Sequence, residues 1–235
     1  PFDATTIRAK RPLAGVDWAG WLQVVDVAGV RYAPTAGTDS TALSTQELRE
    51  AHRALKGKPL RVEVYAEDGA VDDADNPIDD QPFTVSATNY AIHRMQPQGD
   101  NPHGVFLVVN EQAMSWQCER DTSDPRVSHT LTLAVDAYGT ATRTAAVSYQ
   151  RASGASPTTE QQVTTVLVSE TTVIHQDDRD DAYHLAVPAE SKSWELVGDG
   201  LDVGFDAPLD ATTLNTAIDA ATERFVDATR MSAGS

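Results

Sequence analysis

Cys118 is the residue whose type best suits covalent chemistry, because it is the only cysteine among the 235 residues. A catalytic cysteine needs neighbours that lower the pKa of its thiol. Glu119 and Arg120 act on that pKa in opposite directions, and Trp116 precedes the cysteine in a strand-like stretch, where buried structural cysteines also occur. We therefore expect Cys118 to be inert. A single cysteine also excludes an internal disulfide and a zinc site built from a cysteine cluster.

Two acidic stretches could bind calcium through carboxylate oxygens. In the first, residues 72–80, an EF-hand loop starting at Asp73 would need Gly in place of Ile78 and a bidentate Glu in place of Thr84. Both requirements fail, so the sequence favours a solvated acidic loop. The second stretch, residues 177–181, contains Arg179, which partly compensates the neighbouring acids. The sequence therefore favours a solvated acidic loop there as well.

The histidines do not form a metal-binding pattern, since no two lie four residues apart on an expected helix and none belongs to an HExxH sequence. They are His52, His93, His103, His129, His175 and His184. The chain also lacks a GxSxG, P-loop or GxGxxG motif. We expect no catalytic, cofactor-binding or metal-ligating residue, no cofactor and no enzymatic activity. A hydrolase using Cys118 or the acidic loops is the weakest alternative, and we expect His52 at the surface.

The charge balance limits the partners. The chain has 35 acidic and 18 basic residues, a formal net charge of −17, which opposes binding to nucleic acid or to an anionic membrane surface. No apolar run approaches the roughly 18 residues of a membrane span, and the start has no signal-peptide pattern. The excess of Asp over Glu and the scarcity of Lys suit a salty environment. Because the chain begins at Pro1 rather than Met, we expect it to be a segment of a longer protein.

One basic cluster stands out in this acidic chain and consists of Arg49, Arg53, Lys56, Lys58 and Arg61. Its first members share one face of an expected helix. The favoured explanation is pairing with acids such as Glu63 and Glu67. The alternative is docking against an acidic neighbouring surface.

Helical periodicity occurs at two places. Ser44 or Thr45 opens the first helix, with Thr45 as the expected cap, and Leu48, Ala51 and Leu55 recur at helical spacing. Gly57 and Pro59 then end it. The second helix is expected from Asp210 to Met231, where Leu214, Ile218, Ala221 and Phe225 repeat on one face.

Period-two alternation dominates the rest of the chain. Leu60 to Tyr65 alternate and predict a half-buried antiparallel strand, with Leu60, Val62 and Val64 on one face. Residues 128–136 and 140–149 flank a turn at Tyr138–Gly139 and predict a hairpin, with Leu131, Leu133 and Val135 on one side. Other strands are expected at residues 15–25, 83–86, 90–95, 104–109, 114–120, 162–174, 182–188 and 191–196. The fold class is mainly β, antiparallel, with two helices.

Several strings resemble one protein family. Residues 47–69, ELREAHRALKGKPLRVEVYAEDG, resemble a signature of the B component of the insecticidal toxin complexes, the Tc toxins, with SpvB-like and RHS/YD-repeat regions. Other family strings follow in the same order, at residues 82–90, 101–106, 119–133, 136–139 and 182–198. The similarity covers roughly residues 44–230. The sequence departs from the family at Ala189, usually Cys, and at Ser115–Trp116, usually an aromatic pair.

The resemblance implies a non-enzymatic, structural role. In that family the B and C components build a hollow β-shell of the RHS/YD type, which encloses the toxic C-terminal part of C, and B docks onto a pore-forming A component. The implied division is a weakly matched β segment at 1–43, a shell-like β region at 44–206 with a helix at 45–56, and a C-terminal helix at 207–231. The implied partners are the C component, flanking parts of the same chain and, indirectly, the A component, in a secreted extracellular complex.

A second class of function stays open, namely a stand-alone extracellular β-domain that binds a glycan or a protein partner. The two hypotheses differ in the edges of the sheet. A shell segment needs neighbouring strands and should have open edges. A stand-alone domain should be a compact monomer whose edges are covered.

Overall fold

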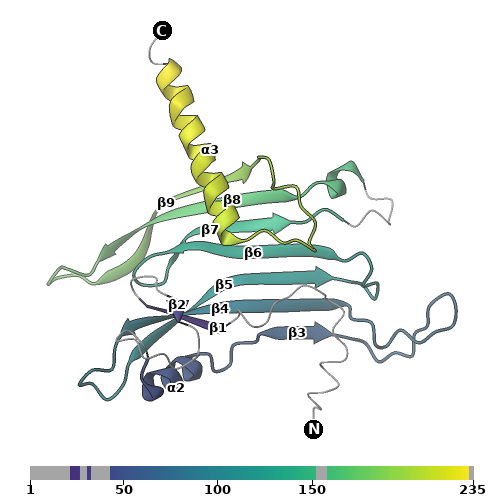
Figure 1. Ribbon diagram of the computed structural model, residues 1–235, viewed down its shortest axis with the longest axis horizontal. Helices are drawn as coiled ribbons and strands as arrows, with labels where there is room; N and C mark the ends of the chain where they lie inside the picture. The colour runs from purple at the N-terminus through teal and green to yellow at the C-terminus, as the bar shows by residue number, and fades with distance from the viewer. Residues whose placement is uncertain (1–21, 27–30, 33–42, 152–157, 233–235) are drawn as a thin grey trace.

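A single twisted sheet organises the chain (Figure 1). The structure, a computed structural model, describes residues 22–26, 31–32, 43–151 and 158–232. Within them one nine-stranded sheet has the order β2-β1-β4-β5-β6-β7-β8-β9, with β3 also paired to β4. The strands are β1 Leu22–Asp26, β2 Arg31–Tyr32, β3 Arg61–Val64, β4 Thr84–Gln96, β5 Val105–Gln117, β6 Arg126–Val135, β7 Ala141–Ser148, β8 Thr165–Gln176 and β9 His184–Leu196. The helices are α2 Thr45–Ala54, α3 Ala211–Ser232 and the 3-10 helix η2 Thr159–Gln162. The mainly β fold class is confirmed.

From β4 to β9 the sheet is an antiparallel meander, in which each strand pairs with the next along the chain. β3 is also antiparallel to β4. β1 is the exception, because it pairs in parallel with β4 at Tyr90–Arg94. β3 and β1 therefore share one edge of β4. Of the strand expected at residues 15–25, positions 15–21 lie outside the described residues.

β4 and β5 are each one strand of 13 residues, where the sequence pattern predicted two short strands apiece. Pairing continues through a β-bulge, because Asn89 pairs with Gln112 and Tyr90 with Asn110, which leaves Glu111 as the extra residue. The Asn89 side-chain amide donates to Glu111 Oε2 at 2.9 Å. The bulge shifts the apolar alternation in mid-strand, so the pattern suggests a break although the hydrogen bonding continues.

The edge strand β3 is half-buried, as predicted, but its polar side faces the core. Val62 and Val64 are 47% and 49% exposed, whereas Arg61 and Glu63 are only partly exposed. Arg61 pairs with Glu63, which also accepts a hydrogen bond from the Tyr65 hydroxyl. These contacts engage Glu63 and Arg61 Nε, whereas Arg61 Nη2 is buried without a hydrogen-bond partner. The apolar side chains of β3 are left on the open side of the sheet.

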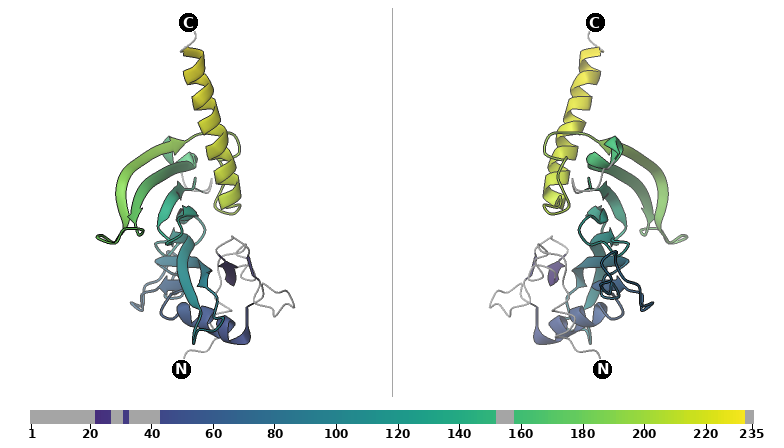
Figure 2. Two further views of the ribbon diagram at one scale, coloured as in Figure 1. Left: turned by 90° about the vertical axis from the view of Figure 1, so that its left-hand side faces the viewer. Right: turned by 90° about the vertical axis from the view of Figure 1, so that its right-hand side faces the viewer.

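The main core lies between one face of the sheet and the first turns of α3 (Figure 2). Leu214 and Ile218 of α3 are 0% and 1% exposed. They belong to a cluster with Val85, Ala87, Trp116, Val127, Leu131, Ala145, Val147, Val166, Val168 and Leu196 of the sheet. Burial of this apolar surface holds α3 on the sheet. Among the described residues, no helix has the length and apolar composition that crossing a membrane requires.

Helix α2 packs on the sheet through a second, smaller cluster. Its N-cap is Ser44, one residue before the cap expected at Thr45. The Ser44 hydroxyl accepts the Glu47 N–H at 3.1 Å, and the Glu47 carboxylate accepts the Ser44 N–H at 2.8 Å. Ala51 is fully buried and clusters with Leu55, as the helical spacing predicts.

The β6–β7 hairpin forms where it was predicted. Asp136 accepts two backbone N–H groups of the turn, both at 2.8 Å, and Gly139 has a φ of +81°. Leu131 and Leu133 contact the main core. Val135 lies beyond a bulge in β6 and is only half-buried.

Candidate functional site

The face of the sheet opposite the main core carries a row of hydroxyl groups. Cross-strand pairing aligns Ser86 of β4, Ser115 of β5, Ser128 of β6, Ser148 of β7 and Thr165 of β8. The last three are exposed and the first two half-buried. The residues on either side of each one in sequence point to the core, because side chains alternate along a strand.

Two further rows continue this surface. The second row is Thr88, Ala113, Thr130, Ala146 and Leu167. The third is Thr132, Thr144, Ser169 and Ser193. The second row continues to Glu195 of β9, which is exposed and charged. In the third row the hydroxyls of Ser169 and Ser193 lie 2.8 Å apart. The three rows together are termed the hydroxyl face.

Charged groups of the same strands lie on the opposite side, next to α3. Arg143 of β7 donates to Glu170 of β8 at 2.7 Å and lies 3.6 Å from the carboxylate of Asp219. Arg143 also donates to the side-chain carbonyl of Asn215 at 3.1 Å. The hydroxyl face is not free of charge, because Arg126 of β6 lies on the same side as Ser128 and Glu195 of β9 pairs with Leu167.

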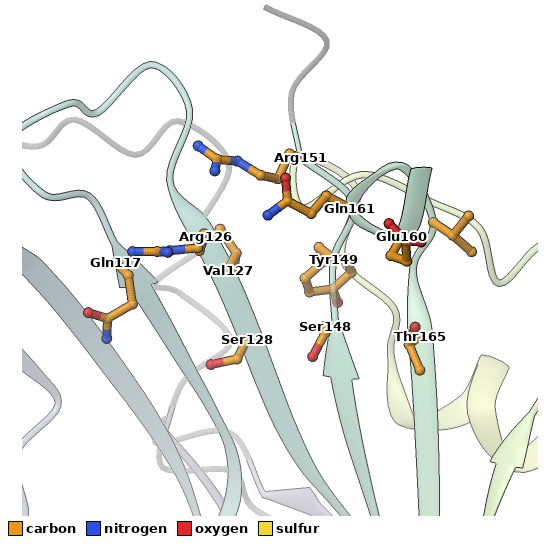
Figure 3. A pocket seen from close by; sticks show the side chains of 11 residues that line it. Gln117, Arg126, Val127, Ser128, Ser148, Tyr149, Arg151, Glu160, Gln161 and Thr165 are labelled. Atoms are coloured by element: carbon orange, nitrogen blue, oxygen red, sulfur yellow. The ribbon is translucent and has the colours of Figure 1, made fainter. Parts of the chain in front are cut away.

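A pocket of about 340 Å³ lies where the first row meets the ends of β6, β7 and β8 (Figure 3). Its lining includes Ser128, Ser148, Thr165, Arg126 and Arg151. Both arginines already have acidic partners, since Arg126 pairs with Glu119 and Arg151 pairs with Asp124 at 2.7 Å. Glu160 also lines the pocket, so the charged groups of the pocket are of both signs and the arginines do not form a dedicated anion site.

The described part of the sheet has unpaired edges. The strand order ends at β9, so the outer edge of β9 faces no strand among the described residues. Most β9 side chains are exposed, and Val187 is 43% exposed. Unpaired N–H and C=O groups along a long edge can accept a further strand.

The core contains a buried polar network that the sequence did not predict. His129 Nδ1 lies 2.9 Å from the Tyr149 hydroxyl, and His129 Nε2 lies 3.0 Å from Gln112 Oε1. The Tyr149 oxygen also accepts the Leu209 N–H at 3.0 Å. Burial lowers the pKa of His129 to about 4 and raises the pKa of Tyr149 to about 12, so both are neutral at pH 7. The network joins β5, β6 and β7 to the segment that leads into α3.

Cys118 lies in the main core and is 5% exposed. Burial raises the pKa of its thiol, and the charge of Asp121 raises it further. Its sulfur contacts the Trp116 carbonyl oxygen at 3.9 Å. The thiol is therefore held in its protonated, weakly nucleophilic form.

The acidic stretches bind their own backbone or neighbouring side chains. Asp72 accepts hydrogen bonds from Ala74 and Asn76. The hydrogen bonds from Asn76 contribute most to the lowered pKa of the Asp72 carboxyl. In the second stretch, Arg179 forms a two-point ion pair with Asp181 at 2.8 Å. Within the described ranges, no group of three or more His, Cys, Asp or Glu residues is arranged to hold a metal ion.

The histidines are dispersed over the fold. His52 is exposed, as predicted. His103 contacts Glu50 at 2.6 Å, and His175 contacts Asp136 at 3.0 Å. The structure does not gather these side chains at one place.

The basic cluster is paired only in part. Arg61 pairs with Glu63, as the favoured explanation predicted. Arg49, Arg53, Lys56 and Lys58 are exposed, and none has an ion pair with a carboxylate in the described part of the chain. The acids of α2 point inward instead, Glu47 towards Arg94 and Glu50 towards His103. Docking of this basic surface against an acidic neighbour remains a prediction.

The sequence of the sheet matches a known family. A sequence model described as the insecticide toxin TcdB middle/C-terminal region matches residues 50–199, from α2 to just past β9. The chain belongs to this TcdB family. The resemblance to the B component of the Tc toxins is thereby confirmed. No curated protein sequence matches the chain.

Solved structures of Tc complexes contain the same fold as this TcdB-family chain. The match to TcdB2–TccC3 has a TM-score of 0.60 and 21% identity, over 74% of this chain and 8% of that chain. The match to TcdB2–TccC3–Cdc42 has a TM-score of 0.64 and 18% identity, over 84% and 10%. The match to the Photorhabdus luminescens Tc holotoxin pore has a TM-score of 0.65 and 19% identity, over 90% and 10%. The chain thus spans about a tenth of the structures it matches.

Proposed function

We propose that this TcdB-family chain is a wall segment of a hollow β-shell in the B component of a toxin complex. The shell encloses the toxic C-terminal part of the C component, which leaves through the pore-forming A component. The mechanism is containment, because a closed wall separates an unfolded passenger from the surroundings until the pore opens. The observation that carries the proposal is a sheet whose end strand, β9, has an unpaired outer edge among the described residues.

The partners in this proposal are the C component, the rest of the B chain and, indirectly, the A component. The solved structures with the same fold are complexes of TcdB2 with TccC3 and a Tc holotoxin pore. We extend those partnerships to this chain because its family and fold are shared. An extracellular location of the complex, and the RHS/YD-type organisation of the shell, belong to the same proposal.

The segment acts without catalysis in this proposal. The buried, protonated Cys118 supports this, since a nucleophilic thiol needs access and a lowered pKa. The carboxylates of the acidic stretches are engaged by Asn76 and by Arg179. These contacts support a structural role for the residues that could otherwise do chemistry.

Limited proteolysis of the assembled complex of the B and C components tests the proposal. We expect the passenger to resist protease in the wild-type complex and to be cleaved when residues 44–206 are deleted from B. The matched control replaces the acidic loop, residues 72–80, with a Gly/Ser linker of equal length, and we expect it to preserve resistance. An equally resistant passenger after the deletion would contradict containment by this segment, and co-purification of B with C verifies assembly in each variant.

The alternative, a stand-alone extracellular domain that binds a glycan or a protein, predicts covered sheet edges. The unpaired edge of β9 in the described residues favours the shell segment. The pocket with already-paired arginines also gives a ligand few free groups to bind.

A further inference from the structure

We propose that the exposed side of α2 is a docking surface for a carboxylate-rich surface of the B chain outside residues 1–235. The docking surface consists of Arg49, Arg53, Lys56 and Lys58, all of them exposed, and is termed the basic stripe. The inference uses the longer B chain of the proposed function, but it does not depend on containment of a passenger.

Helix α2 directs its acids inward and its bases outward. The Glu47 carboxylate lies 3.5 Å from Arg94 of β4 and accepts the Gln98 N–H at 3.0 Å. The Glu50 carboxylate accepts the Gly104 N–H at 2.9 Å. Both acids are therefore held by β4 and by the loop that joins β4 to β5. Neither carboxylate is available to neutralise the basic stripe.

The basic stripe is the exception among the basic side chains of this protein. Every other Lys or Arg whose side chain the structure describes has an ion pair with a carboxylate, namely Arg61, Arg94, Arg120, Arg126, Arg143, Arg151, Arg179 and Lys192. The stripe has no such pair in the described part of the chain, although the sequence contains 35 acidic residues. Lys58 instead lies 5.9 Å from the centre of the Tyr90 ring. The carboxylates that neutralise the stripe are therefore expected from outside this part of the chain.

The dimensions of the stripe fit a local contact with another protein surface. Arg49, Arg53 and Lys56 share one face of α2 and span about 10 Å, at 1.5 Å of rise per residue. An arginine guanidinium binds a carboxylate through two parallel hydrogen bonds. A matching surface presents several carboxylates over the same length.

The net charge of the chain favours an acidic protein surface over a polyanion. Nucleic acids and anionic membranes carry phosphate charge over extended areas. They would therefore meet the field of the whole chain, whose formal net charge is −17. A carboxylate-rich surface of limited size meets mainly the basic stripe.

The same charge favours a partner within the same polypeptide. A second copy of this chain would also carry −17 and would be repelled. A surface of the same polypeptide is present at a high effective concentration, which offsets such repulsion. The chain spans 8% and 10% of two chains with the same fold. A B chain of that length has ample surface outside residues 1–235.

Zero-length crosslinking with a carbodiimide tests this docking, because the reagent joins a lysine amine to a carboxylate in direct contact. It is applied to the full B chain and to the assembled complex of the B and C components, and mass spectrometry identifies the joined peptides. We expect Lys56 to be joined, in both preparations, to an Asp or Glu of the B chain outside residues 1–235. Lys192, which lies 3.1 Å from Glu190, is the internal positive control.

Charge reversal in the stripe provides the matched comparison. The double substitution Arg49→Glu and Arg53→Glu should abolish the Lys56 product, because like charges would then face the partner's carboxylates. The control, Arg126→Glu with Arg179→Glu, changes the net charge equally at two exposed arginines elsewhere and should keep the product. A Lys56 product that survives the reversal in the stripe would overturn the docking contact.

The identity of the crosslinked partner decides the other outcomes. A Lys56 product with the C component, with a second B chain or with an acid inside residues 1–235 overturns the assigned partner. A Lys192–Glu190 product without any Lys56 product overturns the docking surface itself. Protease resistance of the passenger, measured on the same complex, tests containment separately. A resistant passenger without the Lys56 product rejects only the docking, whereas a digested passenger with that product rejects only the shell.

Discussion

Leu107 of β5 occupies the space in which a side chain at Gly139 would lie. A Cβ atom added to Gly139 would be 2.2 Å from Leu107 Cδ2, which is far inside van der Waals contact. Gly139 also has a φ of +81°, a conformation that L side chains rarely adopt. The turn of the β6–β7 hairpin is therefore packed against β5 as well as locally constrained.

The substitution Gly139→Ala should destabilise the chain more than Gly200→Ala, which is the matched control. Both glycines have a φ of +81°, but a Cβ at Gly200 would meet nothing within 4 Å. We expect about 1 kcal/mol of lost stability from the conformation at either site. At Gly139 overpacking against Leu107 should add about 1–3 kcal/mol. Urea unfolding of both variants measures the difference, and equal losses would contradict the close approach.

Acidification should weaken the fold through His129. Its pKa is about 4 in the folded chain and near 6.5 in the unfolded chain, so the unfolded state binds more protons between these values. Its contribution is fully present above pH 6.5 and is lost as the pH falls to about 4. The loss amounts to about 3 kcal/mol for this shift. Unfolding free energies from pH 7 to pH 4 should fall less steeply for His129→Gln, whereas the exposed-site control His184→Gln should follow the wild type. Parallel curves for all three would contradict the assignment.

The Tyr149 hydroxyl should contribute to stability because it bridges two buried partners. Tyr149→Phe leaves the Leu209 N–H and His129 Nδ1 without that oxygen. Unsatisfied buried polar groups cost about 1–3 kcal/mol. The control Tyr183→Phe removes the hydroxyl of a side chain that is 67% exposed, and we expect a change within about 0.5 kcal/mol. Chemical denaturation at pH 7 measures both, and a neutral Tyr149→Phe would show that the network adds nothing.

The separated 235-residue chain should associate through its open edge. Sedimentation at increasing concentration should show self-association that Val187→Lys on β9 weakens, because an edge lysine opposes strand pairing. Val197→Lys, outside the strand, is the control with the same added charge. A chain that stays monomeric at all concentrations would favour the stand-alone binding domain.

The sequence predicted local structure well where one strong signal governs it. The cap and stop signals of α2 predicted the ends of this helix to within a residue or two. The alternating residues on either side of Gly139 predicted the turn there. β4 and β5 were divided into short strands because the bulge at Glu111 interrupts the alternation without interrupting the pairing. A one-dimensional pattern does not contain the partner strand that carries the hydrogen bonds across such a bulge.

Residue types alone could not predict the candidate site. Ser128 and Ser148 are unremarkable in sequence, and only the register brings them into one row. The alternation of Ser and Thr in residues 128–132 was a usable signal, since it implies one hydroxyl-bearing side. On β3, the same kind of alternation identified two faces but not which was buried. The side chains of Arg61 and Glu63 pair with one another on the buried side, which the pattern of apolar residues does not reveal.

Hydrogen–deuterium exchange at the edge strand tests the shell account most directly. Amide exchange of β9, residues 184–196, is compared between the separated chain and the same residues in the assembled complex of the B and C components. β6, which already has a paired strand on both sides, is the internal reference. The account predicts that the outward amides of β9 become protected on assembly while β6 changes little. Unchanged, rapid exchange along β9 in the complex would mean that no strand continues the wall there, which would contradict the account.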